Sequence, residues 1–166
     1  LTLHNGAKTI DGRLVLDGDD DWAESAPLAS ALAAPLVAKT FECWVAPARL
    51  EQRGGGVMNV QTADGATFDA LVFGEREPRR WMSGSNNFQR TQDVGGTDET
   101  AAGELVHLAI AYRADGRIQL YRNGRAYGRA YNIPAQQAFE PAACRVAFGV
   151  RHGSASRGRM FAGAID

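Results

Sequence analysis

The sequence lacks the features that mark several large classes of protein. Its 166 residues carry 18 Lys and Arg against 19 Asp and Glu, and a formal charge of −1 provides no basic field for nucleic acid. No apolar run approaches the roughly 20 residues that cross a bilayer, which argues against membrane insertion. Two cysteines are too few for a disulfide-built scaffold. What remains is the composition of an ordinary globular domain, 45% hydrophobic and 22% charged.

Signatures of catalysis are also missing. There is no G-x-S-x-G, no P-loop and no H-E-x-x-H around the three histidines. A retaining glycosidase needs two carboxylates about 5–5.5 Å apart. Glu75 and Glu77 are close in sequence, but Pro78 and the arginines around it indicate a loop in which both carboxylates would stay ionised. We therefore expect no enzyme, and a glycoside hydrolase is the least favoured alternative.

The two cysteines, Cys43 and Cys144, both lie in strand-like runs with apolar neighbours. A bridge between them would close a loop of about 100 residues and stabilise the fold by about 4–5 kcal/mol. Two buried, unpaired thiols acting as small hydrophobic side chains are the favoured alternative. The spacing alone does not decide between them.

The most informative stretch is residues 104–124. Two alternating apolar runs meet at Asp115-Gly116, and the second run ends at Asn123-Gly124. Such dipeptides between alternating runs predict antiparallel hairpins with type I′ turns. We expect three strands here, over 105–112, 118–121 and 126–131.

Other short apolar runs recur between turn residues, with 19 glycines in the chain. Further strands are predicted over 13–17, 40–45, 57–61, 67–73, 81–82, 145–150 and 160–165. Residues 27–36 form a short connector between two prolines, and 83–103 a long irregular segment. Together they predict an all-β fold with little helix, a single antiparallel jelly-roll β-sandwich of two packed sheets over residues 1–166. The expected core is Leu14, Leu16, Phe41, Cys43, Val45, Leu71, Phe73, Leu108, Ile110, Tyr112, Ile118, Leu120, Val146, Phe148 and Ile165.

Four segments carry a resemblance to a known family. The hairpin at 105–124, the opening strand at 14–18 (LVLDG), the TFE-x-WV strand at 39–45 and the G-x-ID strand at 161–166 occur in the expected order. In these motifs the chain resembles laminin-G-like, concanavalin A-like lectin/glucanase domains. The resemblance implies the sandwich fold, and it implies that the final strand normally continues beyond Asp166.

A narrower resemblance lies in the middle of the chain, at 52–58, 68–75, 81–85 and 90–92. These segments are similar to a module embedded in large planctomycete-type secreted proteins that also carry c-type cytochrome segments. The resemblance implies a piece of a longer, extracellular or periplasmic protein. In that family the module is taken as carbohydrate-binding or adhesive.

A sugar site needs a flat aromatic face and planar polar groups beside it. The irregular segment and the loop after the strand at 145–150 supply both kinds of side chain. The candidate carbohydrate-binding residues are Trp81, Asn86, Asn87, Phe88, Arg90, Gln92, Arg151 and His152. The alternative is that the rings fill the core and the amides bond loop backbone.

Calcium is the cofactor that the resemblance implies, because members of this fold often hold it near the chain ends. Asp17, Asp19, Asp20 and Asp21 offer carboxylate oxygens near a turn, which suit Ca²⁺. The candidate ligands are Asp17, Asp19 and Asp166, because the resemblance pairs the early Asp-Gly with the Asp of the final strand. The spacing does not match an EF-hand, and a solvated acidic turn is the alternative.

We expect a non-catalytic carbohydrate-binding or adhesion module whose partner is a polysaccharide or glycan. The alternative is a structural module that docks on neighbouring domains of its parent protein. A sugar binder should expose Trp81 or Phe88 on a groove with amides beside it, whereas a docking module should bury them and expose a flat apolar patch.

Overall fold

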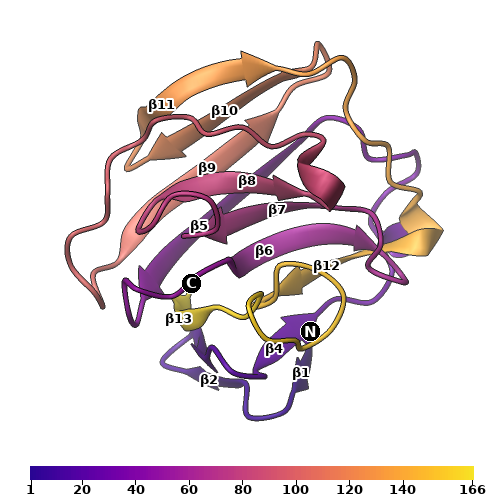
Figure 1. Ribbon diagram of the computed structural model, residues 1–166. Helices are drawn as coiled ribbons and strands as arrows, with labels where there is room; N and C mark the ends of the chain where they lie inside the picture. The colour runs from indigo at the N-terminus through magenta and orange to yellow at the C-terminus, as the bar shows by residue number, and fades with distance from the viewer.

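A computed structural model describes residues 1–166 as two antiparallel sheets packed face to face (Figure 1). The six-stranded sheet has the order β1-β4-β12-β6-β7-β8, and the seven-stranded sheet the order β11-β10-β9-β5-β13-β3-β2. The predicted all-β sandwich with little helix is confirmed. Three turns of 3₁₀ helix are each three residues long, and no helix could cross a bilayer.

The strands of the six-stranded sheet are β1 (Thr2–His4), β4 (Trp22–Glu24), β6 (Gly55–Thr62), β7 (Phe68–Phe73), β8 (Trp81–Ser85) and β12 (Cys144–Phe148). Those of the seven-stranded sheet are β2 (Lys8–Ile10), β3 (Arg13–Asp17), β5 (Lys39–Pro47), β9 (Val106–Tyr112), β10 (Arg117–Arg122), β11 (Arg125–Asn132) and β13 (Ala162–Ile165). The helical turns are η1 (Leu28–Ser30), η2 (Asn86–Phe88) and η3 (Pro141–Ala143).

The core lies between the sheets. Every predicted core residue is buried except Val146 and Phe148, which are half-buried. Ala147, which lies between these two residues on β12, is fully buried. Its side chain points to the outer side of the six-stranded sheet and packs there against Trp22, Val150 and Met160. Cys43 and Cys144 are buried and unpaired, as the favoured alternative predicted.

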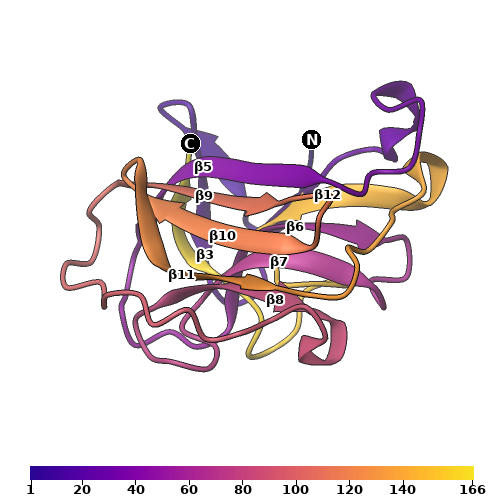
Figure 2. The same cartoon turned by 90° about the horizontal axis from the view of Figure 1, so that it is seen from above.

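The edge strands β11 and β8 approach each other on one side of the sandwich (Figure 2). The Tyr131 hydroxyl of β11 contacts the Ser83 hydroxyl of β8, and the Tyr127 hydroxyl accepts from the backbone N–H of Trp81 at 3.2 Å. These tyrosines bridge the two sheets where no ladder joins them.

The outer faces of the two sheets differ. Burial along β9 alternates residue by residue, so one face of the seven-stranded sheet is open. All six residues of β7 are buried, and Phe68, Ala70, Val72 and Met82 form a separate apolar cluster on the outer side of the six-stranded sheet. Side chains from the segments that border this sheet cover that cluster.

The turn at Asp115-Gly116 corrects a prediction. Only Gly116 has a positive φ (+86°), and its N–H donates to the carbonyl of Arg113 at 3.0 Å, as in a type I turn followed by a left-handed glycine. Asn123-Gly124, with φ of +49° and +74°, is the type I′ turn expected. Strands β1, β2 and β4 were not predicted, because runs of three residues carry almost no periodicity.

Candidate functional site

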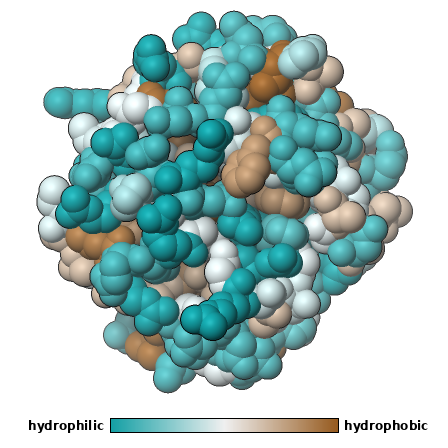
Figure 3. All heavy atoms as spheres, in the orientation of Figure 1, coloured by the Kyte–Doolittle hydropathy of each residue, from teal (hydrophilic) through white to brown (hydrophobic).

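A groove of about 250 Å³ opens on the outer side of the six-stranded sheet. That sheet faces the viewer in Figure 1, and in the same orientation Figure 3 shows a mostly hydrophilic surface with small, separate apolar patches. Four segments supply the groove: the β6–β7 turn, the β7–β8 loop, the η2 turn and the loop after β12. Its lining residues are Gly65, Ala66, Phe68, Glu75, Ser85, Asn86, Asn87, Phe88, Arg151 and His152.

Two stacked rings lie in this groove. The centroids of Phe68 and His152 are 4.2 Å apart with an interplanar angle of 6°. Burial, with Arg159 and Arg151 adding to it, lowers the pKa of His152 to about 4. The imidazole is therefore neutral at pH 7, with one nitrogen able to donate and the other to accept.

Phe88 is the exposed ring of the groove, with 48% of its surface accessible. It follows Asn87, and the two residues have φ values of +54° and +50°. A bulky residue in the left-handed region is rare, and such a conformation costs about 1–3 kcal/mol per residue. The strained pair holds a phenyl face beside two amides, with the Arg76 guanidinium 5.7 Å from the ring centroid.

Glu75 is the only carboxylate among the lining residues, and it pairs with Arg151. Burial raises the pKa of Glu75, and Arg151 opposes that rise. The net direction of the pKa shift is upward, because the effect of burial exceeds that of the arginines. Glu77 does not line the groove, so the structure brings no second carboxylate into the groove for glycosidic cleavage.

Arg90 supports the groove from beneath instead of facing a ligand. Its side chain is buried and donates to Asn86 Oδ1 at 2.7 Å and to the Phe68 carbonyl at 3.0 Å. Its Nε donates to Asp69 Oδ1 at 2.7 Å, and the Nζ of Lys39 lies 2.8 Å from Asp69 Oδ2. Burial lowers the pKa of Lys39, and Asp69 opposes the change. This buried triad of two cations and one anion fixes the backbone and the amide that shape the groove.

The assignment of Trp81 as a carbohydrate-binding residue is wrong. It is 1% exposed, packs against Phe73 in the core, and its Nε1 donates to Glu99 Oε1 at 2.6 Å. Burial of its apolar surface in the core stabilises the fold more than exposure at a sheet edge would. Trp81 therefore offers no ring face to a ligand. Gln92 is exposed but does not line the groove.

The structure thus gathers five predicted residues in one groove: Asn86, Asn87, Phe88, Arg151 and His152. Phe68 was not anticipated as a lining residue. Nothing in its strand marked it, because β7 is apolar at nearly every position, while Glu75 was considered only as a catalyst.

The acidic turn after β3 forms a cluster that differs from the expected one. Carboxylate oxygens of Asp17, Asp20 and Asp21 lie within 4.8 Å of one another. Asp17 Oδ1 accepts backbone N–H groups, the nearest from Asp19 at 2.8 Å, and these bonds lower the pKa of Asp17. Asp21 is 5% exposed and its Oδ1 is buried without a hydrogen-bond partner.

Asp166 and Asp19 lie outside this cluster. Asp166 follows Ile165, which pairs with Leu14, whereas Asp17 pairs with Ala162 near the other end of β13. The carboxylate of Asp166 contacts Arg13 at 3.4 Å. The expected set of Asp17, Asp19 and Asp166 is therefore not brought together.

A family profile, described as the concanavalin A-like lectin/glucanases superfamily, matches residues 17–166. The chain belongs to this superfamily. A search of curated proteins finds no match. Among solved structures the domain is similar to a candidate carbohydrate-binding protein from Bacteroides ovatus, with 16% identity and a TM-score of 0.60. That match covers 87% of this chain and 39% of the other, so the domain spans well under half of that protein.

Two modules named for carbohydrate binding are also similar to this superfamily member. The CBM40 of the Ruminococcus gnavus IT-sialidase, solved with α2,3-sialyllactose, matches at 11% identity and a TM-score of 0.56 over 87% of this chain and 85% of that one. The CBM66 of Bacillus subtilis matches at 13% identity and 0.54 over 99% and 89%. At these identities the likeness establishes the fold.

Proposed function

We propose that the domain is a non-catalytic carbohydrate-binding module that takes a glycan into the groove lined by Phe88 and His152. The observation that carries the proposal is the exposed Phe88 ring beside the amides of Asn86 and Asn87. A phenyl face packs against the C–H face of a pyranose, and amides bond neighbouring hydroxyls in both directions.

The rest of the groove supports the same role. His152 is neutral and stacked, so it presents a flat hydrogen-bonding ring without a net charge. Arg90 and Asp69 hold the groove rigid before a ligand arrives, which lowers the entropic cost of binding. The names of several structural neighbours agree with a sugar-binding role.

A glycan array run with the intact domain tests the proposal, with Phe88→Ala as the site variant. We expect binding to at least one glycan class and at least a tenfold loss in Phe88→Ala. Ile10→Ala, which removes another exposed apolar side chain, on β2, is the matched control and should bind normally. Equal binding by Phe88→Ala and the parent domain would contradict the placement.

We extend the proposal to calcium. Asp17, Asp20 and Asp21 would hold the ion, because the buried Asp21 Oδ1 lacks a partner and a cation would satisfy it. Asp21 lies against the loop that bears Arg151 and His152: a Cβ at Gly149 would meet the Asp21 carbonyl at 3.0 Å. The ion would therefore stabilise one wall of the groove.

The proposed setting is a larger secreted protein of the planctomycete type, in the periplasm or outside the cell. There the module would hold its parent protein on a polysaccharide. The alternative, a module that docks on its own neighbouring domains, is less favoured because Phe88 is exposed in a polar groove and the flat apolar patch expected for docking does not surround it.

A further inference from the structure

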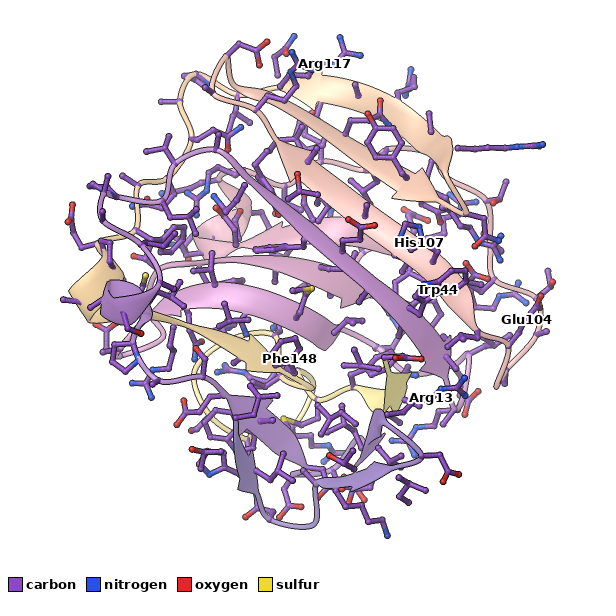
Figure 4. The ribbon with its side chains drawn as sticks, turned by 180° about the vertical axis from the view of Figure 1, so that it is seen from behind. Arg13, Trp44, Glu104, His107, Arg117 and Phe148 are labelled. Carbon is purple, nitrogen blue, oxygen red and sulfur yellow. The ribbon has the colours of Figure 1, made fainter.

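Trp44 is the exposed tryptophan of this protein. It lies on β5, inside the seven-stranded sheet, with 47% of its surface accessible, whereas Trp22 and Trp81 are 8% and 1% exposed. Figure 4 shows it beside His107 on the side of the molecule opposite the groove. An indole presented at the middle of an open sheet face is a candidate for ligand contact.

Strand register places a row of polar side chains beside this indole. Trp44 pairs with His107 of β9, whose backbone N–H donates to Asn123 Oδ1, and the backbone of Trp44 exchanges hydrogen bonds with Asp166. Together Trp44, His107 and Asn123, with Leu105 and Gly124, line an open depression of about 480 Å³.

Fixed contacts orient the polar groups of this depression. His107 Nε2 lies 2.9 Å from Glu42 Oε1, and its ring centroid is 5.1 Å from that of Trp44. Asn123 uses its oxygen on the backbone, which leaves its amide nitrogen to donate to a ligand. Indole, imidazole, carboxylate and amide thus stand side by side with little freedom to lose on binding.

A second exposed ring, Tyr121, lies on the same sheet outside the depression. Tyr121 of β10 pairs with Ala109, and Ala109 pairs with Glu42, so a small residue separates the tyrosine from the carboxylate. Tyr121 lies two strands across the sheet and two residues along it from Trp44, which puts the two residues about 12 Å apart. We refer to the strip of open sheet face between these two rings, which crosses β5, β9 and β10, as the trough.

The charge around this trough selects the class of ligand. Glu42, Glu104 and Asp166 are acidic, and Arg13 pairs with Asp166. Arg117 is on the same side of the molecule, at the end of β10 away from Asn123. The groove on the opposite side is lined by Arg151, with Arg76 over Phe88. An anionic chain would be repelled from the carboxylates, whereas neutral hydroxyls can donate to them.

We propose that Trp44, His107, Asn123 and Tyr121 form a second binding surface that holds a neutral glycan chain across β10, β9 and β5. The rings stack on sugar faces, and Glu42 and Asn123 bond hydroxyls between them. The site is independent of the groove at Phe88 and lies on the other sheet. A protein partner is less suited, because alanines and polar side chains interrupt the apolar area.

Tryptophan fluorescence tests the proposal, because Trp44 is the indole that solvent reaches and the groove contains none. Cellohexaose, xylohexaose and mannohexaose are titrated into the domain, with emission and acrylamide quenching as readouts. We expect at least one of them to shift emission to the blue and to reduce quenching by half or more. Trp44→Ala should weaken binding of that sugar at least tenfold by calorimetry, and Ile10→Ala, on the edge strand β2, should leave it unchanged.

Tyr121→Ala separates the trough from a single-ring contact. It should weaken binding of the hexasaccharide at least threefold and leave binding of the corresponding disaccharide unchanged. The melting temperatures of the Trp44→Ala and Tyr121→Ala variants should stay within about 2 °C of the parent, because substitutions of outward side chains have small effects on stability. Absence of any response at millimolar sugar, or binding by Trp44→Ala equal to that of the parent, would overturn the proposal. Protection of Trp44 by a protein and by none of the sugars would overturn it too.

Discussion

The two outer faces of this sandwich build their surfaces in different ways. On the six-stranded sheet, turns and loops cover the strands, and the groove at Phe88 stands on the buried ions of Asp69, Arg90 and Lys39. On the seven-stranded sheet the strands themselves face solvent, and the spacing of Trp44 and His107 follows directly from register. One face depends on a buried polar network, and the other depends on backbone pairing with exposed side-chain contacts such as that of His107 with Glu42.

This comparison predicts where substitutions are costly. Removing one member of a buried ion network leaves charges without partners, whereas removing an outward side chain from a paired strand leaves the ladder intact. Effects should therefore be large beneath the groove and small on the open face.

The largest effect should follow Asp69→Ala. The change leaves the charges of Lys39 and Arg90 buried without their anion, at a cost of about 3–5 kcal/mol in the free energy of unfolding. Urea denaturation followed by circular dichroism measures it. Glu51→Ala, on an exposed loop, is the control and should change stability by less than about 0.5 kcal/mol. A loss below about 1 kcal/mol for Asp69→Ala would show that the triad does not support the groove face.

Calcium comes next. An ion held at a hundred times its Kd stabilises a protein by about 2.7 kcal/mol, which for a domain of this size raises Tm by about 5–10 °C. Asp21→Asn should abolish the rise, and Asp19→Asn should retain it, because the Asp19 carboxylate lies outside the cluster. Differential scanning fluorimetry with calcium and with EDTA gives the comparison. Loss of the rise in Asp19→Asn alone would contradict the assignment.

Phe88→Gly should separate binding from stability. Glycan binding should fall at least tenfold, about 1.4 kcal/mol, while the domain gains up to about 1 kcal/mol because glycine accepts the φ of +54°. Calorimetric titration and urea denaturation measure the two effects. A joint loss of both would mean that the ring is structural.

The alternation of the open face is why sequence reasoning succeeded there. In β9, inward and outward residues alternate over seven positions, and the sequence predicts the strand, its direction of burial and its hairpin partner β10, but not its pairing with β5. In β7 all six residues are buried, so no period separates the inner from the outer face. The covering of a sheet by loops depends on tertiary contacts that local pattern does not encode.

The residues of the candidate site were also predictable only in part. Composition indicated the segment that bears Asn86 and Phe88, since loops rich in amides and rings are recognisable, and Arg151 was named for its place after a predicted strand. It misassigned Trp81, because only the packing of two sheets decides which large ring is buried. Trp44 stands between the expected core residues Cys43 and Val45, so alternation along β5 turns it outward, but sequence reasoning gave it no role.

The pH dependence of the free energy of unfolding should report on His152 in the groove. The folded pKa of His152, about 4, lies below its ordinary value of 6.5, so folding favours the neutral form. Its contribution is complete above pH 6.5 and is lost as pH falls from 6.5 toward 4, because the unfolded chain then binds the proton more readily. His152→Phe, which keeps a flat ring on Phe68, should flatten the stability profile over that range. Parallel profiles for the two proteins would contradict the assignment.

The smallest effect on stability is expected for Trp44→Ala, within about 0.5 kcal/mol. Leu108→Ala, which empties an inward position of the adjacent strand, should cost about 2–5 kcal/mol. Equilibrium unfolding of both variants sharpens the contrast between the two sides of one sheet. A cost above about 1.5 kcal/mol for Trp44→Ala would place that indole in the structural framework.

The two unpaired thiols can report separately on the local opening of the two sheets. Burial raises the pKa of Cys43, on β5, to about 12, and Cys144 at the start of β12 is buried as well. Neither reacts with an alkylating reagent until its surroundings separate, so the two labelling rates are local opening rates. Mass spectrometry of the labelled peptides can then tell whether the layers part together or the loop-covered one loosens first.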